Sequence, residues 1–387
     1  MVAASSDSCN SLPMMPLSAS DDPAGSAAER PDGPRPAPLV WLLLADKVGD
    51  NAQVRTIADA LPWPSVEKRL KVQPQFATAK PPVIPSLHHL DRARCDPLEP
   101  PWPDLVITIG RRMSMVALWI QEQSQGRTRL AIVGLPRRLG DRFQLVVAAT
   151  QYRGPERPNI LRLDYPPMRI DEPAIAAAAA LWRPRLAGLP RPLTAVLVGG
   201  RTSALRLDAE VGGRLIAGAG RLAAATAGTL YITTSRRTPA EAVDAIAAAL
   251  PDGAVLHRWS AEQAANPYLA LLGLADRFIV TGDSLSMLVE VARLGRPLAI
   301  YPLPAAGGPV ARLGRWLGDR LHRLGLPVGS REVGDLHRLL IRQGFAVWFG
   351  QPFRPPGPRA PDELARIVER VVALVEQPGG RAAPGRN

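Results

Sequence analysis

The stretch "TGDSLSMLVEVARLGRPLAIYP", which runs from Thr281 to Pro302, decides the fold of this 387-residue chain. The apolar residues Phe278 to Val280 come just before it, and a helical pattern begins after its first polar residues. An uninterrupted apolar run is typical of a strand that is buried on both faces, as the strands of parallel sheets are. The stretch therefore predicts a strand, a polar turn and a helix in succession.

This strand–turn–helix unit recurs along the chain in two series. Almost no hairpin signal separates the units, which favours parallel sheets joined by crossover helices. The expected strands of the first series are Leu39 to Leu44, Leu105 to Ile109, Arg129 to Val133, Leu145 to Ala148 and Ile160 to Leu163. The expected strands of the second series are Leu193 to Val198, Thr229 to Thr233, Ala254 to Arg258, Arg277 to Thr281 and Leu298 to Tyr301.

We therefore predict an α/β fold of two doubly wound, Rossmann-like domains that face a crevice. The expected N-terminal domain, on the acceptor side, covers residues 38–187, and the expected C-terminal domain, on the nucleotide side, covers residues 188–350. Residues 351–376 are expected to form a linker and a helix that packs back on the N-terminal domain. Residues 1–37 and 377–387 are expected to be tails, and the first is expected to be disordered because it is rich in Ser, Pro, Asp and Ala.

The chain carries a net charge of +12, and nearly all of its positive charge comes from arginine. This excess has two interpretations, which are a GC-rich genome and a basic patch that binds an anionic membrane or a nucleotide. No zinc-finger spacing, basic heptad region or aromatic-rich motif is present, so we expect no nucleic-acid partner.

No apolar run approaches the about 20 residues of a membrane span, and the first residues lack a basic signal region. We expect a cytoplasmic protein, with peripheral contact to the inner face of the membrane left open.

Small, polar and basic residues follow the strands of the second series. In open α/β sheets, ligands bind beyond the carboxyl ends of the strands, so these residues are expected to form one site. Glycines let a ligand approach the backbone, hydroxyls hydrogen-bond to it, and arginines fit phosphate oxygens. A nucleoside diphosphate matches this combination. The expected nucleotide-binding residues are Gly199, Gly200, Arg201, Thr202, Ser203, Ser235, Arg236, Arg237, Arg258, Gly282, Asp283, Ser284, Ser286 and Glu290.

Each of these features also has a purely structural interpretation. Two glycines after a strand form tight turns, and Ser284 is suited to cap the helix that follows it. In the same interpretation, Arg236 and Arg237 are solvated and Glu290 lies on the exposed face of its helix. The gathering of these residues on one sheet edge is what favours a ligand site.

The first series offers candidates for the acceptor side of a transfer reaction. The sequence "DKVGDN", from Asp46 to Asn51, follows the first strand, and Asp50 is the candidate general base. The alternative is that Asp50 or Asn51 caps the helix that follows. The expected acceptor-side residues are Gly49, Asn51, Gly110 and Arg111.

The acidic residues of the chain are scattered and show no metal-ligand spacing, so we expect neither a metal ion nor a cofactor. In a transfer reaction, Arg201, Arg236 and Arg237 would stabilise the leaving diphosphate in place of a metal. An epimerase or dehydrogenase that acts on nucleotide sugars would need a glycine fingerprint after the first strand. The sequence "ADKVGDNAQ" lacks that fingerprint.

The spacing of Ser284, Glu290, Gly295 and Pro297 resembles a pattern in the donor domain of GT-B glycosyltransferases. It is similar to the stretch of the enzyme that adds N-acetylglucosamine during peptidoglycan synthesis. The resemblance implies that Ser284 lies by a phosphate and that Glu290 contacts the ribose hydroxyls of the donor. Gly199 to Ser203 is similar to the first glycine loop of the same domain.

A second resemblance covers most of the chain, from Trp41 to Pro304. It rests on the motifs "GDNAQ", "PDLVITIGRR", "VLVGGRTSA", "YITTSRRTP" and "NPYLALLGLADRFIVTGDSLSMLVEVARLGRPLAIYPL". These motifs, in this order, resemble the bacterial branch of the "elongated mitochondria" fission-factor family. Plant members of that family help to recruit a dynamin-related protein to the mitochondrial surface.

Together the two resemblances imply two functions. The first is a metal-independent glycosyltransferase that uses a nucleotide-diphosphate sugar, with the acceptor unknown and a lipid-linked one included. The alternative is a non-catalytic scaffold that recruits a partner protein, itself unknown, to a membrane surface. Residues 311–325 bear on the choice, because they carry Trp316 and three leucines at helical spacing with arginines on the remaining arc. They form either a helix packed on the sheet or a helix that lies on an anionic membrane.

Overall fold

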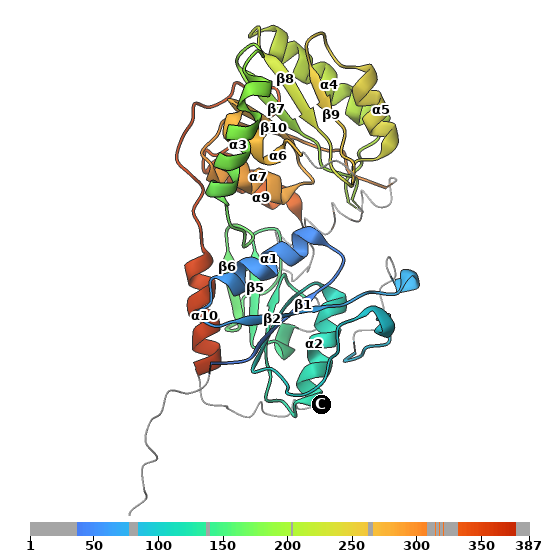
Figure 1. Ribbon diagram of the computed structural model, residues 1–387, viewed down its shortest axis with the longest axis vertical. Coiled ribbons are helices and arrows are strands. Elements are labelled where there is room, and N and C mark those ends of the chain that lie inside the picture. The colour runs from blue at the N-terminus through green and yellow to red at the C-terminus, as the bar shows by residue number, and fades with distance from the viewer. Residues whose placement is uncertain are drawn as a thin grey trace, which may run out of the picture. The chain divides into compact units, whose positions relative to one another are not determined.

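The computed structural model describes residues 37–76, 84–136, 140–202, 204–261, 266–307, 314, 317, 320 and 332–376 (Figure 1). The expected tails lie outside the described residues, apart from residue 37. Ser203 and most of the segment 311–325 lie outside them as well.

The first sheet is parallel and has the strand order β2-β1-β3-β4-β5-β6. Its strands are β1 (Val40–Leu44), β2 (Ser65–Arg69), β3 (Leu105–Ile109), β4 (Arg129–Val133), β5 (Leu145–Ala149) and β6 (Ile160–Leu163). Five of these strands were expected from their apolar runs. The sequence "SVEKR" of β2 has no such run, because this edge strand is mostly exposed and pairs only with β1.

Helices cover both faces of the first sheet. Alternate residues of a strand point to opposite faces, so Leu42 and Leu44 pack on one side and Trp41 and Leu43 on the other. The helices α1 (Val48–Asp59) and α10 (Leu364–Glu376) cover the first of these faces, and α2 (Arg111–Gln123) covers the second. Short 3₁₀ turns at Pro74–Phe76, Arg92–Arg94 and Gly140–Arg142 lie in the connections.

The second sheet is also parallel and has the strand order β12-β11-β10-β7-β8-β9. Its strands are β7 (Leu193–Leu197), β8 (Thr229–Thr233), β9 (Val255–His257), β10 (Arg277–Thr281), β11 (Leu298–Tyr301) and β12 (Val347–Trp348). One face is covered by α3 (Glu172–Leu186), α6 (Tyr268–Leu274), α7 (Leu285–Arg293) and α9 (Val333–Arg342). The other face is covered by α4 (Ala209–Ala224) and α5 (Ala240–Ala248).

Two six-stranded parallel sheets with helices on both faces confirm the expected α/β class and its two doubly wound sheets. The opening stretch folds as expected, with β10 before a turn and α7 after it. One boundary differs in a way that affects the site. α1 begins at Val48, so Asp50 lies in the first helical turn and not in a free loop after β1.

Candidate functional site

The strand order of the second sheet brings two loops of the predicted site together. From β7 the chain moves outward through β8 and β9, and then returns to place β10 on the other side of β7. Such a switch point leaves a gap between the two diverging connections, and ligands of open α/β sheets bind there. The loop after β7, with Gly199 and Gly200, therefore meets the loop after β10, with Gly282 and Asp283.

The carboxylate of Asp283 is the centre of these loop contacts, and its side chain is fully buried. It accepts hydrogen bonds from the backbone N–H of Gly200 at 2.7 Å and from the hydroxyl of Thr281 at 2.8 Å. The Thr281 hydroxyl oxygen in turn accepts a bond from the N–H of Gly199 at 2.8 Å. Burial raises the pKa of Asp283, and these two hydrogen bonds and the charge of Arg237 only partly offset that effect.

The two glycines are required because the protein itself fills the space beside them. A Cβ on Gly199 would lie 2.3 Å from a carboxylate oxygen of Asp283, and a Cβ on Gly200 would lie 2.4 Å from the backbone carbonyl oxygen of Arg237. Side chains could be accommodated at neither position without moving the loop. The N–H groups of both glycines are bonded within the protein, so a ligand at this edge would need other donors.

Ser235 and Thr238, in the loop after β8, hold the same glycine loop from the other side. Both hydroxyls donate to the carbonyl oxygen of Gly199, at 2.9 Å from Ser235 and 2.5 Å from Thr238. The guanidinium of Arg237 is about half exposed and lies 3.6 Å from the carboxylate of Asp283. Ser235 is therefore a structural residue of the loop, and Arg237 is the one that reaches toward solvent.

The opening stretch places Ser284 and Glu290 in different surroundings. Ser284 is the N-cap residue of α7, and it is buried, but its hydroxyl makes no capping hydrogen bond. Ser286 and Glu290 are four residues apart, so they lie on the same face of α7. Ser286 is exposed, and Glu290 is partly buried beneath it.

Glu290 is paired with Tyr268, the first residue of α6, whose hydroxyl donates to the Glu290 carboxylate. Burial raises the pKa of Glu290, and the hydrogen bond from Tyr268 lowers it by less. Burial also raises the pKa of the Tyr268 hydroxyl well above its ordinary value, and the charge of Glu290 adds to that rise. Glu290 thus lies neither on an exposed helix face nor in an empty cavity, since a tyrosine holds its carboxylate in one position.

The remaining predicted nucleotide-binding residues are spread along the same edge. Arg201 is mostly exposed and lies 3.9 Å from Glu241, and Arg236 is exposed. Arg258 lies 3.6 Å from Asp244 on α5, and no contact joins it to Asp283 or Glu290 among the residues that are described.

The hydroxyl of Thr202 accepts a bond from the N–H of Leu205 at 3.0 Å, which closes its own turn. Gly282 is buried, and its carbonyl oxygen lies 2.7 Å from Nε2 of His337 on α9.

The acceptor-side candidates lie at the switch point of the first sheet, where β1 is flanked by β2 and β3. Asn51 closes the turn after β1, because its side chain donates to Ala45 O at 2.7 Å and accepts from Ala45 N at 3.1 Å. Asp50 is one-third exposed and lies 3.8 Å from Nζ of Lys47, the N-cap residue of α1.

Of the remaining acceptor-side candidates, Gly49 is an exposed residue in the first turn of α1. Gly110 is the N-cap residue of α2 with a φ of +82°, a conformation that favours glycine, and Arg111 follows it and is exposed.

A pocket of about 220 Å³ lies beside Asn51 at the carboxyl ends of β1 and β2. Its wall includes the ion pair between Lys71 and Asp46, which are 2.8 Å apart, and Arg55, whose guanidinium is held by Glu67. Asp50 is not among the residues of that wall. The structure thus brings Asn51 and Asp46 together and leaves Asp50 outside their pocket.

Two residues that hold groups of the predicted nucleotide-binding set were not expected from the sequence. Tyr268 and His337 lie 22 and 55 residues away from the groups that they bind. No local spacing pattern could pair residues so far apart, and only the asparagine–proline turn before Tyr268 marks a helix start. Across the described part of the chain, no group of three or more His, Cys, Asp or Glu side chains is placed to hold a metal ion.

Comparison with known sequences gives the family of the chain. Residues 48–373 match the family described as "Mitochondrial fission ELM1". The chain belongs to this family. Within it, the mitochondrial fission protein ELM1 of Arabidopsis thaliana is 30% identical over 152 residues, which are 39% of this chain and 35% of the plant protein. The matched part therefore spans about a third of that relative's length.

Solved structures with a similar chain path include a UDP-GlcNAc 2-epimerase from Neisseria meningitidis bound to UDP-GlcNAc. The likeness covers 87% of this chain and 99% of that one, with 9% identity and a TM-score of 0.47. MurG of Acinetobacter baumannii is similar over 88% of this chain and 91% of its own, with 14% identity and a TM-score of 0.43. None of the helices within the described ranges is long and apolar enough to cross a membrane.

Proposed function

We propose that this member of the fission family binds a nucleotide-diphosphate sugar at the β7–β10 switch point and transfers the sugar without a metal ion. The observation that carries the proposal is the shared face of α7, on which Ser286 lies above a Glu290 carboxylate positioned by Tyr268. A positioned carboxylate beside a helix N-terminus suits a ribose diphosphate, since the carboxylate accepts bonds from ribose hydroxyls and the helix end attracts phosphate.

The phosphate groups would bind at the N-terminus of α7. The first N–H groups of a helix have no partner within the helix, and a helix dipole contributes about 0.3–1 kcal/mol to a nearby anion. Because Asp283 already occupies the N–H of Gly200, the glycine loop supports this site from below and does not hold phosphate itself.

Two exposed arginines would complete the phosphate site. Arg201 and Arg237 extend from the neighbouring loops, and each charged hydrogen bond contributes about 1.5–3 kcal/mol. A few such contacts reach the about −8 kcal/mol of a micromolar complex.

Ligand-dependent thermal stability tests the binding step. UDP, GDP, ADP and their diphosphate sugars are added separately to the wild-type protein, and at least one is expected to raise its melting temperature. Glu290→Gln keeps the size of the side chain and its bond to Tyr268 but removes a charged acceptor, so we expect a smaller shift. Glu210→Gln, an exposed change on α4, is the matched control. A protein whose melting temperature does not respond to any of these nucleotides does not have the proposed site.

Asp50 is the proposed general base of the transfer. It stands in the first turn of α1, at the switch point of the first sheet, with a side chain that solvent reaches. A positioned base contributes about 10²–10⁴-fold to a rate, so Asp50→Asn is expected to reduce turnover by that factor and to leave nucleotide binding unchanged. Single-turnover measurements with the nucleotide sugar identified above check this, and retained turnover would exclude Asp50 from the role.

Recruitment to a membrane surface is the second candidate function, and the family description favours it because it names mitochondrial fission. In the segment 311–325, residues 314, 317 and 320 are helical and exposed, and Leu317 is 49% exposed. The remainder of that segment lies outside the described residues. Arg312→Glu combined with Arg315→Glu is expected to reduce salt-sensitive cosedimentation with anionic vesicles. A wild-type protein that stays in the supernatant at low salt would rule out this candidate.

A further inference from the structure

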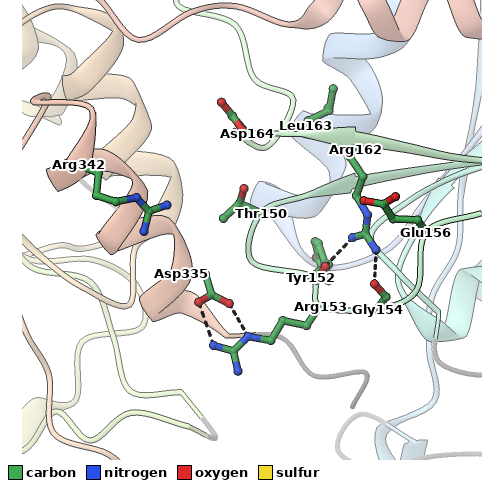
Figure 2. A pocket seen from close by; sticks show the side chains of 10 residues that line it. All are labelled: Thr150, Tyr152, Arg153, Gly154, Glu156, Arg162, Leu163, Asp164, Asp335 and Arg342. Atoms are coloured by element: carbon green, nitrogen blue, oxygen red, sulfur yellow. Dashed lines mark hydrogen bonds and ion pairs between the residues drawn. The ribbon is translucent and has the colours of Figure 1, made fainter. Parts of the chain in front are cut away.

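A second pocket, of about 400 Å³, lies at the carboxyl ends of β5 and β6, and α9 forms one of its walls (Figure 2). Its volume falls within the range of small-molecule sites, which is about 300–1,000 Å³. None of its lining residues belongs to the nucleotide site proposed above. The charged groups in its wall decide what it can bind.

The loop between β5 and β6 is held in shape by Arg162. Its guanidinium donates to the carbonyl oxygens of Tyr152 and Gly154, both at 2.7 Å, and to that of Pro155 at 3.0 Å. These bonds use three of the five N–H donors of Arg162 and fix its side chain as part of the wall.

The wall formed by α9 is fixed by an ion pair between Arg153 and Asp335 (Figure 2). The two guanidinium–carboxylate bonds measure 2.5 and 2.9 Å, and Arg338 donates to the same carboxylate at 2.5 Å. Burial would raise the pKa of Asp335, but the bonds from both arginines lower it overall, so the carboxylate stays charged and paired. Neither member of this pair is therefore available to a ligand.

Four side chains of the wall keep binding capacity. The side chains of Arg342, Thr150 and Glu156 have no hydrogen bond or ion pair with any residue in the described ranges, and Figure 2 shows Arg342 extending toward the space beside Thr150 and Asp164. The carboxylate of Asp164 accepts one weak bond, from Nε2 of Gln343 at 3.3 Å. The pocket therefore offers one guanidinium, one hydroxyl and two carboxylates with free acceptor capacity, those of Asp164 and Glu156.

We propose that this pocket binds a sugar phosphate. The guanidinium of Arg342 presents a planar pair of donors that matches phosphate oxygens, and Thr150 can add a hydroxyl donor. Asp164 repels a phosphate and accepts bonds from hydroxyls, so it orients the sugar away from Arg342. The site stands apart from the proposed nucleotide site and does not depend on it.

Calorimetric titration of the full chain with glucose 6-phosphate, ribose 5-phosphate, inorganic phosphate and glucose tests the proposal. We expect a sugar phosphate to bind more tightly than inorganic phosphate, and glucose to bind least.

Arg342→Gln is expected to weaken sugar-phosphate binding at least about tenfold, which equals about 1.4 kcal/mol. Asp164→Asn is expected to weaken the sugar phosphates but not inorganic phosphate. Arg169→Gln, which removes an exposed arginine outside the pocket, is the control and should change nothing.

Two results would overturn the proposal. One is the absence of sugar-phosphate binding at millimolar concentration, and the other is equal binding by the wild type and Arg342→Gln. Arg342→Lys keeps the charge but loses the paired donors, so an intermediate affinity in that variant supports the assignment even if Arg342→Gln is unstable.

Glu290→Gln distinguishes the two sites, because it should weaken the binding of nucleotides only. If it abolished sugar-phosphate binding instead, the ligand would be at the nucleotide site and this pocket would be excluded.

Discussion

At the scale of single residues, Gly200 shows how tightly the loop after β7 is built. Its missing side chain leaves room for the backbone of Arg237, whose carbonyl oxygen would be 2.4 Å from a Cβ. Because a backbone atom cannot rotate away, Gly200→Ala is expected to destabilise the fold by about 1–3 kcal/mol in denaturant unfolding. Gly213→Ala, on α4 with nothing within 4 Å of its Cβ position, should stabilise by about 0.4–1 kcal/mol. Equal effects at the two positions would contradict the packing argument.

The sequence alone identifies these glycines but not the reason for them. A pair of glycines after a strand predicts close approach of some group to the backbone, and a ligand was the expected group. The structure fills the space with Asp283 and Arg237, which are 83 and 37 residues away from Gly200 along the chain. Contacts at such separations leave no local pattern, so residue spacing could not distinguish an internal carboxylate from a bound phosphate.

Glu290 should make the stability of the protein depend on pH. Burial raises its folded-state pKa above the ordinary value of 4.5, so its stabilising contribution is complete below that value and is lost as the pH rises through the folded pKa. Glu290→Gln stays neutral and can keep the bond from Tyr268. The free energy of unfolding of this variant, relative to the wild type, is therefore expected to increase from pH 4 upward. A difference that does not change with pH, in urea unfolding at several pH values, would show that burial does not govern this carboxylate.

At the scale of secondary-structure elements, periodicity predicted the buried strands and failed for the short or exposed elements. β10 and α7 could be predicted from the opening stretch, because an apolar run, a short polar turn and a helical pattern follow one another there. β2 was missed because its residues are charged and exposed, and β12 because it has only two residues. The start of α1 at Val48 has no clear mark in the sequence, since its N-cap residue, Lys47, makes no side-chain capping bond.

The helix α10 has apolar residues at helical spacing, and this apolar stripe packs into the core of the first sheet. Ile367 and Val371 are fully buried where α10 packs against β4, β5 and α1, and other apolar residues of the same stripe pack around them. Ile367→Ala removes a buried side chain and is expected to cost about 2–5 kcal/mol of unfolding free energy. Glu369→Ala, two residues along on the exposed face, should change stability by less than about 0.5 kcal/mol. If both variants unfold at the same denaturant concentration, α10 does not contribute to the core.

At the scale of the whole molecule, the sequence predicted two parallel sheets but not the polar contacts that tie distant segments together. Arg293 on α7 is one such tie, because its buried guanidinium donates to the carbonyl oxygens of Met168 and Pro361. Tyr165 and Gln343 form another, through a hydrogen bond between their side chains. A lone arginine or tyrosine in a sequence carries no sign of a partner 68 to 178 residues away, so only the folded chain identifies these ties.

The ion pair between Arg153 and Asp335 joins segments 182 residues apart, and it should contribute more than a surface pair. The Arg153 side chain is only 8% exposed and that of Asp335 21%, so removing one partner leaves a poorly solvated charge. Arg153→Gln and Asp335→Asn are each expected to cost about 3 kcal/mol, and the double variant should cost less than their sum. The same cycle on Arg359 and Glu172, 61% and 59% exposed, should give a coupling below about 1 kcal/mol.

The coupling between Arg153 and Asp335 should also depend on pH. The bonds from Arg153 and Arg338 outweigh burial and hold the pKa of Asp335 below its ordinary value of 3.8. A carboxylate with a lowered folded-state pKa stabilises the fold above the unfolded-state value, and the effect is lost as the pH falls through the folded pKa. The coupling energy is therefore expected to be constant at neutral pH and to decline below about pH 4, as measured by unfolding of the four proteins of the cycle. A coupling as small as that of Arg359 and Glu172 at neutral pH would mean that α9 is held by its apolar face alone.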